Sequence, residues 1–154
     1  MPQTYELYRR VSSLPLGKRF FSLMYGRKAP YFRTVRPQVR TVRPHYAELT
    51  IALRHSVENH IGTLHAIAVC NGLEAAMGLL AEATTPPERR WIPKGMQVNY
   101  VAKSTTDLLC VAETDPQDWL ETGDVGVRVK AVRTDGVVVV EGIITIYVSD
   151  RPAR

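Results

Sequence analysis

The residue whose type and position most suggest chemistry is Glu74. It follows an uncharged stretch from Ile61 to Leu73, and residues 75–80 continue without charge. An ionised carboxylate is costly to bury without a partner, so we expect a polar cleft around it. In such a cleft Glu74 could act as a general base or as a nucleophile that forms an acyl intermediate. The structural alternative is that Glu74 pairs with one of the many arginines or lies on a narrow exposed stripe.

Four residues ahead of Glu74 could complete a site, namely Asn59, Gly62, His65 and Ala66. If a helix begins near Gly62 to His65, the N–H groups of His65 and Ala66 lack intrahelical acceptors and could polarise a carbonyl. Asn59 could orient a water molecule or the carboxylate, and the alternative is a turn or cap residue. His65 could help to hold the carbonyl, or it could be a hydrogen-bonded core residue.

The elements that must position these residues follow from the apolar pattern. Residues 62–83 are rich in Ala and Leu and end at TTPP, which predicts one long helix that is apolar, and therefore buried, nearly all round. Strands are predicted at 45–54, 96–104, 108–114, 125–133 and 137–148, the last two joined by a hairpin at 134–136. This order predicts an α+β domain in which an antiparallel sheet wraps around the helix.

Composition limits the class of protein. With 154 residues, 45% of them hydrophobic, the chain suits one globular domain. Its two cysteines lie in apolar runs without CxxC spacing, and the histidines have no metal-ligand spacing, so reduced core thiols and no metal are expected. The uncharged stretch before Glu74 is shorter than the ~20 residues of a membrane span, and the amino terminus has no apolar signal core. We therefore expect a soluble, cytoplasmic protein.

The first 44 residues are strongly basic. They hold ten of the 20 Lys and Arg residues but only one of the 15 acids, Glu6. One or two short amphipathic helices are predicted within 4–26, and the repeated RTVRP at 33–37 and 40–44 predicts an extended, irregular edge. Such a segment suits an anionic partner, either a phosphorylated cofactor, a membrane surface or nucleic acid, and the alternative is a solvated face.

The order of elements resembles the hot-dog fold, and the residues above resemble the phenylacetyl-CoA thioesterase-like branch of its thioesterase superfamily. In that branch an Asn, a Gly, a His and then an acid occur before and on the central helix. Here these are Asn59, Gly62, His65 and Glu74, with six positions from Asn59 to His65 and nine from His65 to Glu74. The stretch MQVNYVAKS at 96–104 is similar to the strand that follows the helix. The resemblance covers residues 45–148.

The resemblance implies a hot-dog domain at 45–150 and a basic helical or extended segment at 1–44 that packs on it. It implies an acyl-CoA thioesterase with coenzyme A only as part of the substrate, without a further cofactor or metal. The implied catalytic residues are Glu74, Asn59 and His65, and the implied substrate-binding residues are Gly62, Ala66, Lys94 and Lys103. Sites would form between subunits of a dimer or dimer of dimers, with Asn59 of one chain facing Glu74 of the other, and without nucleic acid or a membrane span.

Two departures from the family pattern keep alternatives open. Ala66 and Ile67 stand where two glycines are usual, and Pro93 stands near a position that often carries a hydroxyl. A different acyl group would explain both, as would a noncatalytic acyl-CoA or fatty-acyl binding module. The basic segment leaves a third alternative, an electrostatic adaptor. A hot-dog dehydratase is a weaker alternative, because the proline-rich His-then-Glu pattern of that branch is absent.

Overall fold

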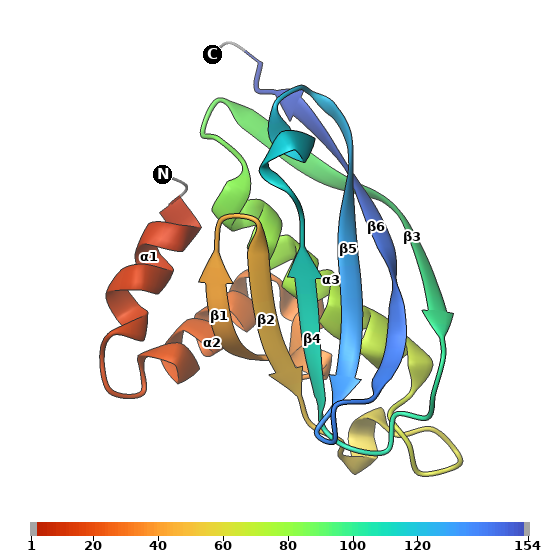
Figure 1. The fold of residues 1–154 in the computed structure, drawn as a ribbon. Helices are drawn as coiled ribbons and strands as arrows, with labels where there is room; N and C mark the ends of the chain where they lie inside the picture. Colours follow the sequence, from red (N-terminus) through yellow and green to blue (C-terminus); the bar gives the residue numbers. More distant parts are fainter. Residues whose placement is uncertain (1–2, 153–154) are drawn as a thin grey trace.

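The computed structural model describes residues 3–152, which form three α-helices, three short 3₁₀ helices and one antiparallel sheet (Figure 1). The α-helices are α1 (Gln3–Ser12), α2 (Gly17–Lys28) and α3 (Ala66–Thr84). The 3₁₀ helices are η1 (Pro30–Thr34), η2 (His55–Val57) and η3 (Pro116–Trp119). The strands are β1 (Gln38–Arg43), β2 (Tyr46–Ile51), β3 (Arg89–Tyr100), β4 (Leu108–Glu113), β5 (Gly123–Arg133) and β6 (Val138–Asp150).

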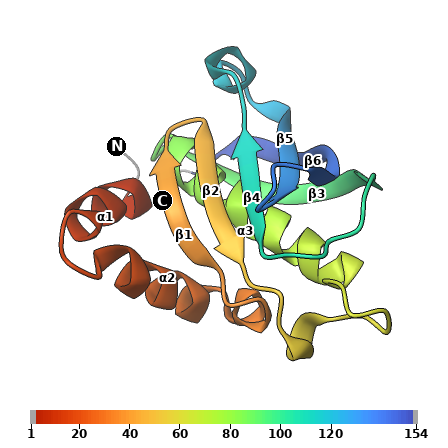
Figure 2. The same ribbon diagram turned by 60° about the horizontal axis from the view of Figure 1, so that its bottom comes forward.

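The six strands are arranged in the order β1-β2-β4-β5-β6-β3, and each pair of neighbours is antiparallel. The strand that directly follows α3 in the chain, β3, therefore lies at the far edge and pairs only with β6. In both ribbon views α3 lies along one face of the curved sheet (Figures 1 and 2). This arrangement confirms the predicted α+β hot-dog fold.

Helix α3 forms the centre of the hydrophobic core. Leu73, Leu79 and Leu80 are fully buried on it, against strand residues such as Leu49 and Ile144. Gly72 permits close packing on β4, because a Cβ at this position would lie 2.8 Å from Sγ of Cys110. By length and composition α3 could also cross a membrane, but 67% of that apolar stretch is buried inside the protein. The burial of α3 in the core of this domain therefore accounts for the hydrophobicity of the helix.

One stripe of α3 is open to solvent, so the prediction that the helix is buried nearly all round is wrong there. Ile67 is 57% exposed, and Cys70 and Glu74 are half-buried. These positions lie three and four residues apart and therefore share one side of the helix. The helix also begins at Ala66 rather than near Gly62, because residues 59–63 form a turn.

The basic segment covers a side of α3 that the sheet leaves bare. Its helices pack together through Tyr8 and Phe21, whose ring centroids are 5.1 Å apart. Asn71 of α3 donates to Oγ1 of Thr34 at 2.7 Å and so ties η1 to the central helix. The same segment supplies the edge strand β1, so position 44 falls in the turn between β1 and β2.

Candidate active site

Glu74 lies midway along α3 and lines a small cavity of about 200 Å³. We call this hollow the Glu74 cavity. Its walls come from α1, α2, η1, α3 and β3, and the lining residues are Thr4, Tyr25, Lys28, Ala29, Phe32, Glu74, Met77, Gly78, Glu82 and Trp91. Among residues 3–152, the Glu74 carboxylate makes no hydrogen bond and no ion pair. The structural alternative of an arginine partner is therefore wrong for the described chain.

A second carboxylate in the same cavity, Glu82, has a full set of partners. It accepts hydrogen bonds from Oγ1 of Thr4 at 2.9 Å and from Nε1 of Trp91 at 3.3 Å. Lys28 lies 3.6 Å from the same carboxylate. Glu82 thus joins α1, α2 and β3 around α3. The two carboxylates of the cavity therefore differ in their partners: Glu82 holds neighbouring elements together, whereas Glu74 makes no such contact among the described residues.

Tyr25 of α2 forms one wall of the Glu74 cavity. Its hydroxyl donates to the carbonyl oxygen of Ala75 at 2.9 Å. Burial, followed by the negative charges of Glu82 and Glu74, raises the pKa of Tyr25 far above its usual value. Tyr25 therefore stays a neutral donor. Gly78 makes room for it, because a Cβ there would lie 3.0 Å from the Tyr25 hydroxyl.

The amino terminus of α3 is capped by His65. Its ring Nδ1 accepts a hydrogen bond from the N–H of Ile67 at 3.1 Å, as an N-cap side chain does. The N–H of His65 donates to the carbonyl oxygen of Val57 at 2.9 Å. The expectation that this N–H could polarise a substrate carbonyl is therefore wrong. Among the described residues, the N–H of Ala66 makes no hydrogen bond. Ala66 is thus a donor that this helix end leaves for a ligand.

Asn59 and Gly62 shape the turn that leads into α3. Oδ1 of Asn59 accepts from the N–H groups of Ile61 and Thr63, both at 3.1 Å, and its Nδ2 donates to Oγ1 of Thr63 at 2.8 Å. Gly62 has a φ of 74°, a conformation that favours glycine. The Asn59 side chain is therefore engaged within its own turn.

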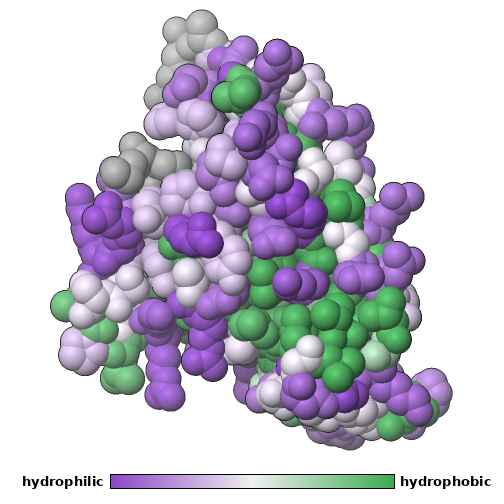
Figure 3. All heavy atoms as spheres, in the orientation of Figure 1, coloured by the Kyte–Doolittle hydropathy of each residue, from purple (hydrophilic) through white to green (hydrophobic). Residues whose placement is uncertain are grey.

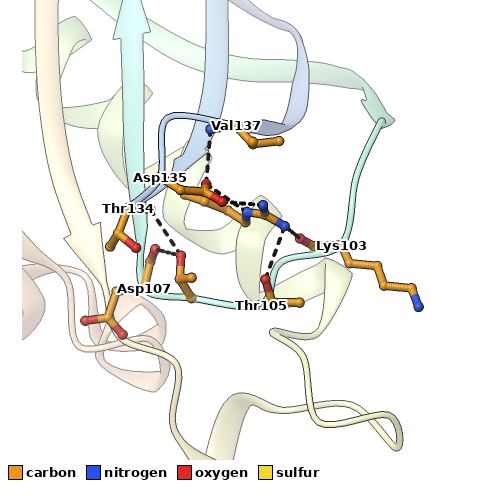
Figure 4. A network of polar contacts seen from close by, with 8 residues as sticks. Lys103, Thr105, Asp107, Thr134, Asp135 and Val137 are labelled. Atoms are coloured by element: carbon orange, nitrogen blue, oxygen red, sulfur yellow. Dashed lines mark hydrogen bonds and ion pairs between the residues drawn. The ribbon is translucent and has the colours of Figure 1, made fainter.

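The two candidate lysines differ in their surroundings. Lys94 forms an ion pair with Asp124, with Nζ 2.6 Å from Oδ2. Lys103 lies in the loop after β3, where its carbonyl oxygen accepts from Arg133 at 3.3 Å while its amine points away from the network (Figure 4). The next residue, Ser104, accepts a hydrogen bond from the N–H of Leu64, just before α3. Within the described part of the chain the Lys103 amine has no ion-pair partner, and the hydrogen bond of Ser104 places the Lys103 backbone near the amino terminus of α3.

Within one chain the two halves of the expected site are apart. His65 and Glu74 are nine residues apart, which corresponds to about two and a half turns and roughly 13 Å along the axis. They therefore project from opposite sides of α3. The open stripe carries Ile67, Cys70 and Glu74, and beside it Cys70 lies 3.4 Å from the hydroxyl of Tyr100 on β3. Cys70 and Tyr100 line an open hollow of about 650 Å³ at the unpaired edge of β3.

Sequence reasoning missed the cavity walls from the basic segment. Tyr25 comes from residues that predicted only packing helices, and Phe32 lies between these residues and the predicted extended edge. Glu82 could have been found, because it follows Glu74 by eight residues and hence lies on a neighbouring part of the helix surface. Within residues 3–152 no group of three or more His, Cys, Asp or Glu residues is arranged to hold a metal ion.

A protein-family model described as a domain of unknown function, DUF4442, matches residues 17–148. No curated protein matches the chain. A solved structure described as genomics APC5556 is 42% identical, with a TM-score of 0.84, covering 96% of this chain and 99% of that one.

Two more distant solved structures share the fold. One is a Pseudomonas aeruginosa protein described as a probable thioesterase, 19% identical, with a TM-score of 0.76 over 90% of this chain and 97% of that one. The other is a thioesterase family protein from Silicibacter pomeroyi, also 19% identical, with a TM-score of 0.69 over 84% and 99%.

Proposed function

Given that the chain belongs to the DUF4442 family, we propose that it is an acyl-CoA thioesterase. Glu74 is the general base or nucleophile, and the amino terminus of α3 polarises the thioester carbonyl. The observation that carries this proposal is a carboxylate that lines a cavity without any structural partner among the described residues. Groups of this kind concentrate at functional sites. The thioesterase names of the two fold neighbours support the same reaction class.

The reaction requires the acyl carbonyl to meet a donor and a carboxylate at once. The free N–H of Ala66 is the donor, and His65 positions it by capping the helix. Because Ala66 and Glu74 of one chain are eight residues apart, which is about 12 Å along the axis of α3, the site takes one group from each of two chains. The unpaired β3 edge and the exposed Ile67 suit a dimer, with a dimer of dimers as the larger assembly.

The Glu74 cavity takes the acyl group. Its volume of about 200 Å³ is below the roughly 300–1,000 Å³ of sites for drug-sized ligands. Phe32, Met77 and Trp91 give it largely apolar walls. A short or compact acyl group fits this space. Lys103 contacts the phosphates of coenzyme A, whereas Lys94 is held by Asp124.

The test is a hydrolysis panel from acetyl to long-chain and aryl acyl-CoA. Glu74→Gln should lower kcat by about 10²–10⁴-fold for every substrate that the wild type hydrolyses, because the base or nucleophile is lost. Glu82→Gln is the comparison in the same cavity. It should lower Tm, because three contacts weaken, and reduce hydrolysis far less than Glu74→Gln. Equal activity of Glu74→Gln and wild type would rule out the proposed role.

The alternative is a noncatalytic acyl-CoA or fatty-acyl binding module. It is favoured by Ala66 and Ile67, whose side chains restrict the backbone approach that glycine would permit. In that case acyl-CoA would raise Tm in a saturable way without any release of free thiol. Turnover of any substrate would reject this alternative.

A further inference from the structure

Helix α2 carries more apolar side chains than the fold buries. Phe21 and Tyr25 face the protein interior. Phe20 and Leu23 lie three residues apart on the outer side of α2, with exposures of 56% and 55%. Leu16, the residue just before the helix, is 72% exposed. Figure 3 shows hydrophobic residues near the α1–α2 connection, at the lower left, beside projecting hydrophilic side chains. We call these three residues the outer stripe of α2.

Beside the outer stripe lies a hollow of about 710 Å³ rich in arginine, here called the arginine cleft. It is lined by Arg19, Ser22, Leu23, Gly26, Pro30, Arg33, Thr34, Arg36, Pro37 and Gln38, a set without any carboxylate. Among residues 3–152, the guanidinium groups of Arg19, Arg33 and Arg36 make no hydrogen bond or ion pair. Three cations thus surround one hollow without an internal counterion.

A fourth arginine increases the positive charge nearby. Arg54 donates to the carbonyl oxygen of Thr34, one of the cleft residues. Partial burial, and then the charge of Arg36, lower the pKa of Arg54. Arg54, which follows β2, therefore adds positive charge beside the cleft and supplies no counterion to the cleft arginines. An external anion would relieve this repulsion.

We propose that the outer stripe of α2 and the arginine cleft together dock the protein on an anionic membrane surface. The guanidinium groups bind lipid phosphates, and Leu16, Phe20 and Leu23 enter the region between headgroups and acyl chains. Lys and Arg side chains are attracted to anionic lipids, and exposed Leu and Phe side chains gain free energy when they leave water for the interface. The inference does not depend on thioester hydrolysis.

Other occupants fit the two features less well. Nucleic acid would neutralise the arginines but would leave Phe20 and the exposed leucines in water. A second copy of this chain would cover the apolar residues but would bring two basic surfaces together, which is unfavourable. An anionic lipid surface satisfies both the charge and the apolar side chains.

The experiment is cosedimentation of the full chain with phosphatidylcholine vesicles, with and without phosphatidylglycerol. Binding is expected only with phosphatidylglycerol and should weaken as salt increases. Arg19→Gln and Arg36→Gln should each weaken binding roughly fivefold, the value expected for one cation near the surface. Phe20→Ser should weaken it about tenfold or more, because a large apolar side chain no longer inserts.

Two matched variants control for charge and exposed hydrophobicity elsewhere. Lys130→Gln removes an exposed cation from the sheet, and Leu120→Ser removes a leucine that is 73% exposed after η3. Both should bind vesicles like the wild type, and all variants should keep the wild-type circular dichroism. Equal binding to neutral vesicles, no binding at all, or unchanged binding of Arg19→Gln and Phe20→Ser would overturn the proposal. Dissociation of an oligomer by Phe20→Ser, measured by light scattering, would assign the stripe to a second copy instead.

Discussion

At the scale of single residues, Asn59 has two possible roles: it could orient a water molecule, or it could stabilise the turn before α3. Its amide makes three hydrogen bonds within residues 59–63, immediately before the helix whose end we propose to polarise a carbonyl. A side chain with this many local partners acts on the site mainly by placing the amino terminus of α3. Substitutions that keep or remove the acceptor oxygen separate the two roles.

Asn59→Ala should lower the free energy of unfolding by about 1–3 kcal/mol, because two N–H groups lose their acceptor. Asn59→Asp keeps that acceptor and should retain most of the stability and most of kcat. Urea unfolding and acyl-CoA hydrolysis measure the two quantities. Full stability of Asn59→Asp combined with loss of hydrolysis would instead assign Asn59 to the chemistry.

The two thiols differ in burial, since Cys110 is enclosed and Cys70 is partly exposed. Cys110 is completely buried, and burial, with a smaller contribution from Cys70, raises the pKa of its thiol to about 12. The unfolded chain loses this proton near pH 9, so above that pH the unfolded state binds fewer protons than the folded state. Stability is therefore expected to fall as pH rises towards about 12.

The free energy of unfolding should decrease by up to about 1.4 kcal/mol per pH unit through this thiol. Urea unfolding between about pH 8 and pH 10 measures the slope. Cys110→Ala should flatten it. Thiol alkylation of the folded protein should modify Cys70 alone. Modification of both thiols at equal rates would contradict the buried environment of Cys110.

At the scale of elements, the position of β3 depends on how closely it approaches β6. Gly142 of β6 lies between β3 and β5, and a Cβ there would stand 2.0 Å from the carbonyl oxygen of Gln97. Gly95 of β3 has nothing within 4 Å of the same added atom. The two glycines therefore differ in whether a methyl group fits, although both lie in paired strands.

Gly142→Ala should destabilise the protein by roughly 1–3 kcal/mol or more, because β3 must move away from β6. Gly95→Ala should change stability by less than about 0.5 kcal/mol. Thermal unfolding compares the two variants directly. Similar Tm values for both would mean that β3 can shift without cost.

The same strand illustrates what could be predicted from the sequence. Strands β4, β5 and β6 have Val-rich patterns and were predicted to within two residues, as was the end of α3. By contrast β3 begins at Arg89 rather than 96, because its first half carries charge and Pro93 and resembles a loop. An edge strand tolerates a proline, and the pairing with β6 is interrupted between Pro93 and Gly95.

Prediction of the candidate site has a different limit. Residue type, spacing and the family resemblance made Glu74, His65 and Asn59 candidates, because residue type and spacing are local properties of the sequence. The contacts that distinguish Glu74 from Glu82 are not local: Thr4 and Glu82 are 78 positions apart. The spacing of residues in the sequence does not indicate which of two carboxylates will have such a distant partner. The walls of the Glu74 cavity could therefore not be predicted from the sequence.

At the scale of the whole molecule, the separation of Ala66 and Glu74 along α3 allows a test of whether the site forms between two chains. Ala66 is the first residue of α3, where proline fits, and the preceding His65 has a ψ of 136°, which proline also permits. Ala66→Pro therefore removes the free N–H and leaves the helix in place. Glu74→Gln removes the carboxylate. Each variant alone should be inactive.

If each site takes Ala66 from one chain and Glu74 from the other, mixed dimers contain one intact site. After unfolding and refolding of an equal mixture, hydrolysis should recover to about a quarter of the wild-type rate, because half of the dimers are mixed and each has one working site. Separately refolded variants mixed afterwards serve as the control. No recovery in the refolded mixture would place both groups in one chain.

The Glu74 cavity takes its outer wall from residues 4–32 and its carboxylate from α3. These two stretches are separate in the gene, and different kinds of mutation act on each. Under the proposed function, substitutions in the first stretch alter the shape of the cavity, and substitution of Glu74 alters the reaction. A change in the wall from residues 4–32 can therefore alter ligand preference while the helix that carries the proposed base stays the same.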